Sequence, residues 1–135
     1  MNRLVIVGCG RLAEIITNAV VKPMLPNYEL VGVYSRTASK AERIANKMRQ
    51  HGKMCAACHT LKELLELKPD YLVESASPAA MKELALPTLE NGTSIITLSI
   101  GALADTSFYQ KVKETAKAND TRVYLVSGAT GGFDV

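Results

Sequence analysis

Short apolar runs alternate along this chain with segments whose apolar residues recur at helical spacing. The runs predict buried strands at residues 4–7, 28–35, 53–57, 71–75, 94–99 and 122–126. The helical spacing predicts helices that run to Lys22, over 38–51, from Thr60 to Leu67, from Ser77 to Asn91 and from Asp105 to about Ala118. Alternating strands and helices predict an α/β fold: a Rossmann-type doubly wound parallel sheet of six strands in order 3-2-1-4-5-6, with helices on both faces.

Polar residues mark the starts of the predicted helices. Thr60 and Glu63 have the spacing of a capping box, in which side chain and backbone groups at a helix start bond reciprocally. Ser77 followed by Pro78 is typical of an N-cap with proline in the first turn. After the last predicted strand comes a glycine-rich tail, residues 127–135, to which the pattern assigns no element.

The first predicted strand enters a Gly-x-Gly-x-x-Ala turn that opens into the first helix. Gly8 permits the sharp turn, Gly10 lets a pyrophosphate approach the backbone, and Ala13 fits where helix and strand pack closely. The N–H groups at the helix start, at Arg11 and Leu12, and the positive end of the helix dipole would face the phosphates. This context indicates a dinucleotide-binding turn. The alternative is a structural turn without a ligand.

The loop after the second predicted strand bears on the choice of dinucleotide. An acidic residue at this place binds the ribose hydroxyls of NAD, but the sequence reads Ser35-Arg36-Thr37. A serine hydroxyl and a guanidinium fork suit a 2′-phosphate, which a carboxylate would repel. We therefore expect NADP to be preferred, with NAD as the second possibility. The alternative is that Arg36 stacks on the adenine and Ser35 only caps the helix.

The predicted strand order places the ligand crevice at the carboxyl ends of strands one and four. The glycine turn, the Ser35 loop and the loops at 75–78 and 99–102 should then lie along one edge of the sheet. Glu74 ends the fourth strand near this edge. It could touch substrate or cofactor, or it could be a strand-end residue bonded to backbone. The two histidines, His51 and His59, lie away from the edge and receive no catalytic role.

Composition places the chain among ordinary soluble domains. Its 135 residues suffice for one domain with a real core, and 47% of them are hydrophobic. No apolar run is long enough to span a bilayer, and the apolar start is too short for a signal peptide, so we expect a cytoplasmic location. Residues 36–53 carry six basic groups against one acid, whereas the remainder sums to −2. The pattern indicates a solvated helix face for most of these residues or a local basic patch, not a nucleic-acid surface that covers the whole domain.

Cys55-Ala56-Ala57-Cys58-His59 spells the pattern of a c-type haem attachment site. We reject that interpretation because the segment falls in the third predicted strand. Residues three apart on a strand point to opposite faces, so the two thiols would not meet one partner. The same geometry weakens a redox or zinc site, and no metal is expected. Cys9 lies inside the glycine turn, where we expect it to pack.

Four stretches together resemble the amino-terminal domain of the L-aspartate dehydrogenases, relatives of the homoserine dehydrogenase nucleotide-binding domain. They are residues 7–10 (VGCG), 72–78 (LVESASP), 98–105 (LSIGALAD) and 127–134 (SGATGGFD). The resemblance runs from end to end of the chain. It implies oxidative deamination of aspartate, or its reversal, with NAD(P). It further implies that Ala76, Ser77, Pro78, Gly101 and Ala102 line the nicotinamide side and that Ala129 meets the cofactor.

The chain departs from the family in three ways. Thr130 stands where an aliphatic residue is usual, and the second strand lacks its acid. Such enzymes also continue into a second domain that carries substrate groups and a catalytic histidine, which residues 1–135 do not contain. We expect a cofactor-binding domain without catalytic residues, with negligible turnover of aspartate alone and with self-association possible. The alternatives are a non-catalytic dinucleotide-binding module or sensor subunit, and the cofactor domain of a homoserine or sugar-type dehydrogenase.

Overall fold

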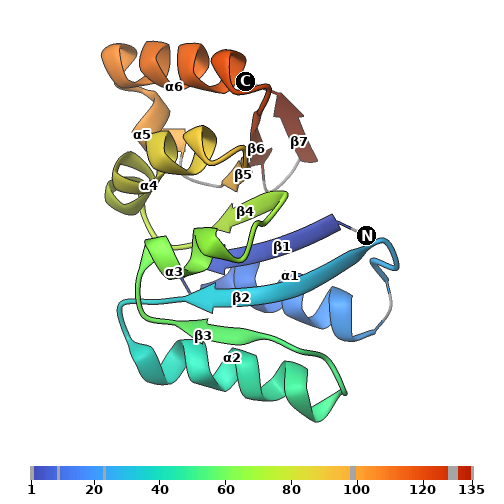
Figure 1. The fold of residues 1–135 in the computed structure, drawn as a ribbon. Helices are drawn as coiled ribbons and strands as arrows, with labels where there is room; N and C mark the ends of the chain where they lie inside the picture. The colour runs from blue at the N-terminus through green and yellow to red at the C-terminus, as the bar shows by residue number, and fades with distance from the viewer. Residues whose placement is uncertain (1, 9, 23, 98–99, 128–130, 135) are drawn as a thin grey trace.

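A computed structural model describes residues 2–8, 10–22, 24–97, 100–127 and 131–134 and places its strands in one seven-stranded sheet (Figure 1). The strands are β1 (Asn2–Val7), β2 (Tyr28–Tyr34), β3 (Ala56–Cys58), β4 (Tyr71–Glu74), β5 (Ser94–Thr97), β6 (Val123–Ser127) and β7 (Gly131–Asp134). Their order is β3-β2-β1-β4-β5-β6-β7, and the pairs among the first six are all parallel. The predicted six-stranded order is confirmed. The sequence pattern missed β7, an antiparallel edge strand within the glycine-rich tail.

The helices are α1 (Arg11–Val21), α2 (Ala38–Gln50), α3 (Leu61–Glu66), α4 (Pro78–Glu90), α5 (Ile100–Leu103) and α6 (Thr106–Ala118). Five of them match the predictions within one or two residues at each end, whereas the short α5 was not expected. The predicted caps form. The hydroxyl groups of Thr60 and Ser77 accept hydrogen bonds from the N–H groups of Glu63 and Ala80. The Glu63 carboxylate in turn accepts the N–H of His59, one residue earlier than a capping box would have it.

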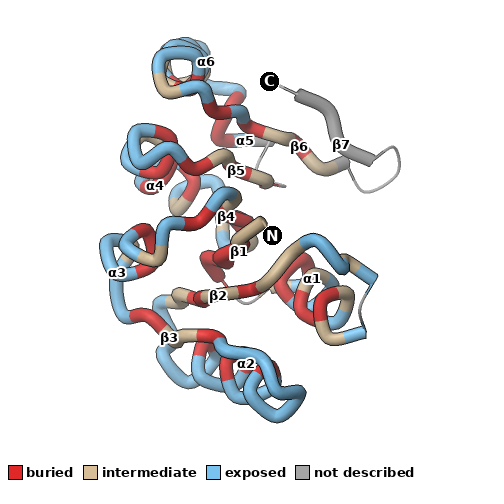
Figure 2. Tube along the Cα trace, turned by 45° about the vertical axis from the view of Figure 1, so that its right-hand side comes forward, coloured by how far each residue is buried: buried red, intermediate tan, exposed pale blue. Residues whose placement is uncertain are grey.

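Helices cover both faces of the sheet, as predicted. One core packs strand residues such as Leu4, Ile6 and Val33 against α1 and α2. The other packs Val5 and Leu72, which alternate with the first set along the strands, against α3, α4, α5 and α6. Figure 2 shows α3 and α4 on one side of the strands and α1 on the other, with the buried positions between them. β1 and most of β4 are thus covered on both faces and read as continuous apolar runs, whereas alternate residues of β5 and β6, such as Ile96 and Tyr124, are only partly buried.

Three tyrosine rings lie in a row on the sheet face that α1 partly covers. Tyr71 of β4 stands between Tyr28 and Tyr124, with ring centroids 6.1 and 6.4 Å away. The rings line an apolar hollow of about 420 Å³ together with Ile16 and Ile96. Each tyrosine is only partly buried. The expectation of self-association stays a prediction.

The third strand lies later than predicted, at Ala56–Cys58 instead of residues 53–57. The guanidinium of Arg49 donates a hydrogen bond to the carbonyl oxygen of Cys55, 3.0 Å away. That bond ties the chain before β3 to the end of α2, and pairing with β2 begins only at Ala56, opposite Gly32.

The two cysteines of the haem-like pattern face opposite sides of the sheet, as the strand geometry predicts. Cys55 belongs to the core beneath α1 and α2, and Cys58 belongs to the core on the other face. Both side chains are buried. Burial raises the pKa of the Cys55 thiol from 9.0 to about 12, against an opposing effect of Arg49, and it also raises the pKa of Cys58. Neither thiol is in the thiolate form that a redox site needs.

Cys55 should therefore resist alkylation in the folded chain. We expect iodoacetamide at pH 8 to modify Cys55 at least about 100-fold more slowly than in the urea-unfolded chain, because little thiolate forms and the sulfur is buried. Peptide mass mapping of a time course separates this thiol from the others. Equal rates in the folded and unfolded chain would contradict the assigned burial.

Candidate functional site

A crevice opens at the carboxyl ends of β1, β2 and β4, where the strand order reverses direction. Its volume is about 440 Å³. It is lined by Val7, Gly8, Gly10, Tyr34, Ser35, Arg36, Lys40, Leu61, Ser75, Ala76, Ser77, Ala80, Glu83 and Leu84. In doubly wound sheets this is the place where ligands bind, because the loops on the two sides of the reversal diverge and leave a cleft.

The glycine turn after β1 forms the floor of this crevice. Gly8 has a φ of +91°, and a Cβ at this position would stand 2.9 Å from the backbone of Ala76. At Gly10 a Cβ would stand 2.9 Å from the carbonyl oxygen of Ser75. Both glycines are therefore required by the close approach of the β4–α4 loop. Neither glycine can carry a Cβ unless that loop moves, and both line the crevice.

The amino terminus of α1 begins in this turn. Gly10 is the N-cap residue and has no side chain of its own to cap the helix. The N–H group of Ala13 donates to the Ser75 hydroxyl, 3.3 Å away, which links α1 to the loop after β4. A helix that begins at a glycine, just after a glycine turn, fits a phosphate group, since the first N–H groups and the helix dipole attract an anion.

The loop after β2 supplies positive charge to one side of the crevice. Arg36 and Lys40 are exposed, and both line the crevice. The Ser35 hydroxyl accepts the N–H of Thr37 at 3.2 Å, which holds the turn, and its own proton remains a donor. Thr37, not Ser35, occupies the N-cap position of α2. Among the lining residues the one carboxylate is Glu83, on α4 across the crevice.

The loop after β4 forms the opposite side, and Glu74 holds it in place. This carboxylate is 1% exposed. One of its oxygens, Oε2, accepts the N–H groups of Ala76 and Ser77 at 2.7 and 2.8 Å. The other, Oε1, accepts the hydroxyl of Thr97, at the end of β5, at 2.6 Å. Of the two roles left open for Glu74, the structure shows the hydrogen-bonded one.

Six of the residues predicted for the cofactor line the crevice, namely Gly8, Gly10, Ser35, Arg36, Ala76 and Ser77. Six others lie near it without lining it, namely Arg11, Leu12, Thr37, Pro78, Gly101 and Ala102. The side chains of Leu12 and Ala102 are buried in the two cores, so these residues can offer only backbone groups. Gly101 approaches Pro78, which brings α5 beside the start of α4. Ala129 falls outside the described residues.

Lys40 is the main lining residue that the sequence interpretation missed. It lies in the first turn of α2, which begins in the loop that Ser35 and Arg36 form. A basic residue in the turn after a candidate phosphate-binding loop is a signal that could have identified it. Of the six basic groups in residues 36–53, Arg36 and Lys40 face the crevice, while Lys47 instead donates to Asn18.

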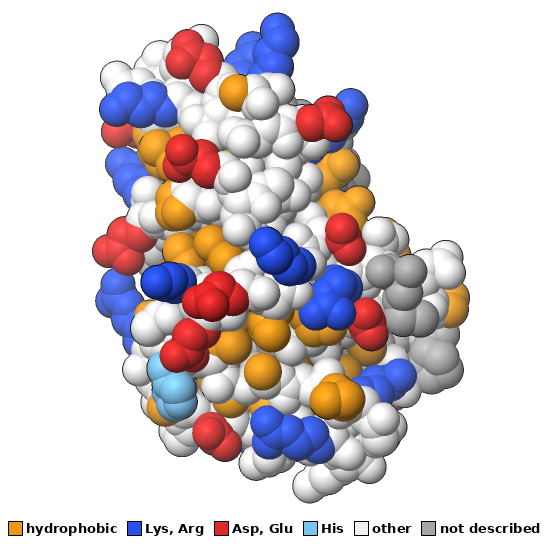
Figure 3. All heavy atoms as spheres, viewed as in Figure 1, with side chains coloured by type: hydrophobic (Ala, Val, Ile, Leu, Met, Phe, Trp, Pro, Cys, Tyr) orange, Lys and Arg blue, Asp and Glu red, His pale blue; other side chains and the backbone are white. Residues whose placement is uncertain are grey.

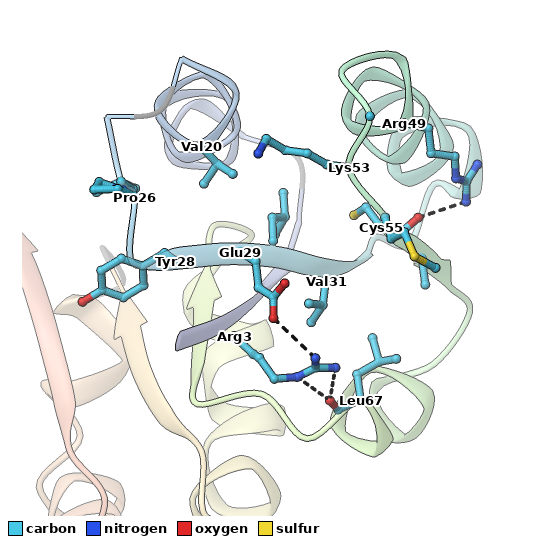
Figure 4. Close-up of a pocket in the computed structure, with 15 residues that line it drawn as sticks. Arg3, Val20, Pro26, Tyr28, Glu29, Val31, Arg49, Lys53, Cys55 and Leu67 are labelled. Carbon is cyan, nitrogen blue, oxygen red and sulfur yellow. Dashed lines mark hydrogen bonds and ion pairs between the residues drawn. The ribbon is translucent and has the colours of Figure 1, made fainter. Parts of the chain in front are cut away.

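A larger groove of about 1150 Å³ lies at the other end of the sheet, at the amino ends of β1, β2 and β3 (Figure 4). Its arginines are already engaged. Arg3 donates two hydrogen bonds to the carbonyl oxygen of Leu67 and pairs with Glu29, and Arg49 is bonded to the Cys55 carbonyl (Figure 4). These groups tie loops together. The groove also lacks a glycine turn of the kind that opens the crevice, so we assign the binding site to the crevice.

One face of the molecule shows no second candidate site among the residues that the structure describes (Figure 3). On the face seen in Figure 3, basic and acidic side chains are interspersed around small apolar areas. Within the described residues no group of three or more His, Cys, Asp or Glu side chains could hold a metal ion. None of the helices in that part of the chain is both long enough and apolar enough to cross a membrane.

Comparison with known proteins finds L-aspartate dehydrogenases among the relatives. L-aspartate dehydrogenase of Methanocaldococcus jannaschii is 34% identical over 134 residues, which is 99% of this chain and 48% of that protein. The chain thus spans about half the length of the curated relatives it matches. Aspartate dehydrogenase of Thermotoga maritima has a similar structure, with 23% identity, a TM-score of 0.65, and coverage of 97% of this chain and 48% of that one.

Structures with lower sequence identity to this chain also share the fold. The WlbA dehydrogenase of Chromobacterium violaceum, solved with NADH and UDP-GlcNAcA, superimposes with a TM-score of 0.75 at 16% identity, over 93% of this chain and 34% of that one. The family model described as homoserine dehydrogenase, NAD binding domain, matches residues 8–126, from the glycine turn to the end of the parallel sheet. This chain, with its glycine turn and crevice, belongs to the family of homoserine dehydrogenase NAD-binding domains.

Proposed function

We propose that this chain is the dinucleotide-binding domain of an L-aspartate dehydrogenase and that it prefers NADP to NAD. The observation that carries the proposal is the crevice itself. Two glycines that tolerate no Cβ, the start of α1, and the cations Arg36 and Lys40 after β2 lie together at it. The choice of aspartate as the substrate is supported by the similarity to L-aspartate dehydrogenases.

Each part of the crevice suits one part of the cofactor. The backbone of the turn and the first N–H groups of α1 would hold the pyrophosphate. The adenosine half would then lie toward β2, where Ser35, Arg36 and Lys40 can bind a 2′-phosphate. The nicotinamide half would lie toward β4, over the loop that Glu74 holds. Arg36 stacked on the adenine is the alternative role for that residue.

When bound, the nicotinamide supplies a hydride acceptor for oxidation of an amino acid, with release of a proton and formation of an imino acid. This chain's residues bind and orient the cofactor for that chemistry. Among the crevice-lining side chains, the ionisable ones are Tyr34, Arg36, Lys40 and Glu83, and neither histidine is among them. We therefore propose that turnover requires residues beyond these 135, which would enclose the substrate and supply an acid–base group.

A binding titration followed by a turnover assay tests the function. The chain should bind NADPH at one site with enhanced cofactor fluorescence. Addition of aspartate to the chain with NADP should produce no NADPH absorbance above background. Rapid turnover by the 135 residues alone would contradict the proposal that turnover requires further residues. A longer version of the chain that oxidises homoserine and not aspartate would reassign the substrate, and one with no dehydrogenase activity would favour a sensor module.

A further inference from the structure

Glu74 is a charged side chain in the interior at the floor of the crevice. It ends β4 beside Val7, the last residue of β1, and the N–H of Ser75 next to it donates to the Val7 carbonyl at 2.8 Å. Its side chain is 1% exposed, so it does not line the crevice. A buried carboxylate is costly unless it is well hydrogen-bonded.

Its hydrogen bonds place the carboxylate directly under the loop that borders the nicotinamide half. The N–H groups of Ala76 and Ser77 bind Oε2, and both residues line the crevice. The hydroxyl of Thr97 binds Oε1 from the neighbouring strand. These three donors fix the carboxylate in position beneath the loop.

We propose that the buried charge of Glu74 favours the oxidised over the reduced cofactor and so sets the redox preference of the bound nicotinamide. The inference rests on the proposed function, which places the nicotinamide over the Ala76–Ser77 loop. The oxidised ring is a cation, whereas the reduced ring is neutral. A carboxylate shielded from solvent acts on that difference far more strongly than an exposed one, because the medium around it screens charge weakly.

Glu74→Gln tests the charge while keeping the shape. The amide oxygen can accept the N–H groups of Ala76 and Ser77, and the amide NH₂ can donate to the Thr97 hydroxyl, which then acts as acceptor. We expect the affinity for NADP⁺ to fall about tenfold relative to the affinity for NADPH. Dissociation constants for both forms are measured by calorimetry, with thermal unfolding as a check that the variant is folded.

Two control variants separate this role from general effects. Glu90→Gln makes the same chemical change at an exposed position at the far end of α4, outside the crevice, and solvent screening should leave the ratio of the two affinities within about twofold. Thr97→Val removes one donor and keeps the charge, so both affinities should change together. A Glu74→Gln variant that lowers both affinities equally would overturn the inference and leave only a structural role for the side chain.

The wild-type chain gives a second readout that does not depend on any variant folding. The ¹³C resonance of the Glu74 carboxyl group should shift on saturation with NADP⁺ clearly more than with NADPH. Equal shifts would overturn the inference. If the folded wild-type chain binds neither NADP⁺ nor NADPH, the proposed function fails and this inference fails with it. If the chain binds both forms, but Glu74→Gln leaves the ratio of the two affinities unchanged, only this inference fails.

Discussion

Gly10→Ala is expected to lower the affinity of the chain for NADP by at least about 100-fold. The added Cβ would stand 2.9 Å from the carbonyl oxygen of Ser75, so the turn or the loop after β4 must move. Either movement displaces the backbone N–H groups that would bind the pyrophosphate. Each charge-assisted hydrogen bond contributes about 1.5–3 kcal/mol, and the loss of two gives an effect of this size. Calorimetric titration of the folded variant measures it.

Gly92→Ala is the matched control for that substitution. Gly92 follows α4 with a φ of +83°, and nothing lies within 4 Å of a Cβ added there. Alanine at this position should cost about 1 kcal/mol of stability from backbone strain and leave NADP affinity unchanged. If Gly10→Ala bound NADP as tightly as the control does, the turn would not be the phosphate site.

Arg36→Ala is expected to lower the affinity for NADP about 10- to 100-fold and to leave the affinity for NAD within about twofold. The guanidinium is exposed at the crevice and would pair with the 2′-phosphate that only NADP carries, a charge-assisted contact of about 1.5–3 kcal/mol. Parallel titrations with NADP and NAD provide the measurement. The wild-type chain should bind NADP more tightly than NAD.

Arg43→Ala controls for the loss of one positive charge from α2. Arg43 is exposed on the same helix but lies away from the crevice, near Asn18. It should change the affinities for both cofactors by less than about twofold, since solvent screens exposed charges at such separations. If Arg36→Ala weakened both cofactors equally, the arginine would stack on the adenine. Tighter binding of NAD than of NADP by the wild type would exclude the proposed preference.

Much of this fold can be predicted from short-range patterns in the sequence. β1 is covered on both faces and appears as an apolar run. Thr60 and Ser77 mark the starts of their helices, and their caps form as expected. The strand order follows from the glycine turn and from the rule for parallel crossovers. The β7 strand could not be foreseen, because its residues carry no alternating pattern and it is defined by pairing with β6.

The site was less predictable than the fold, because tertiary contacts define it. On the sequence alone, Gly8 is explained by the sharp turn and Gly10 by the approach of a phosphate group. The structure shows another reason for both glycines, which is the close approach of Ser75 and Ala76. Glu74 could be placed at the right edge, but its bonds to Ala76 and Ser77 depend on how the loop folds back. The side chain of Leu12 packs in the core, so this residue can offer only backbone groups to a cofactor.

The central claim is that the crevice at the carboxyl ends of β1, β2 and β4 is the dinucleotide site. It is tested most directly by recording amide ¹H–¹⁵N spectra of the labelled chain during titration with NADPH. The account predicts the largest shifts at residues 10–13, 35–37 and 75–77. Shifts confined to the groove at residues 52–56, or unchanged spectra at millimolar NADPH, would contradict it.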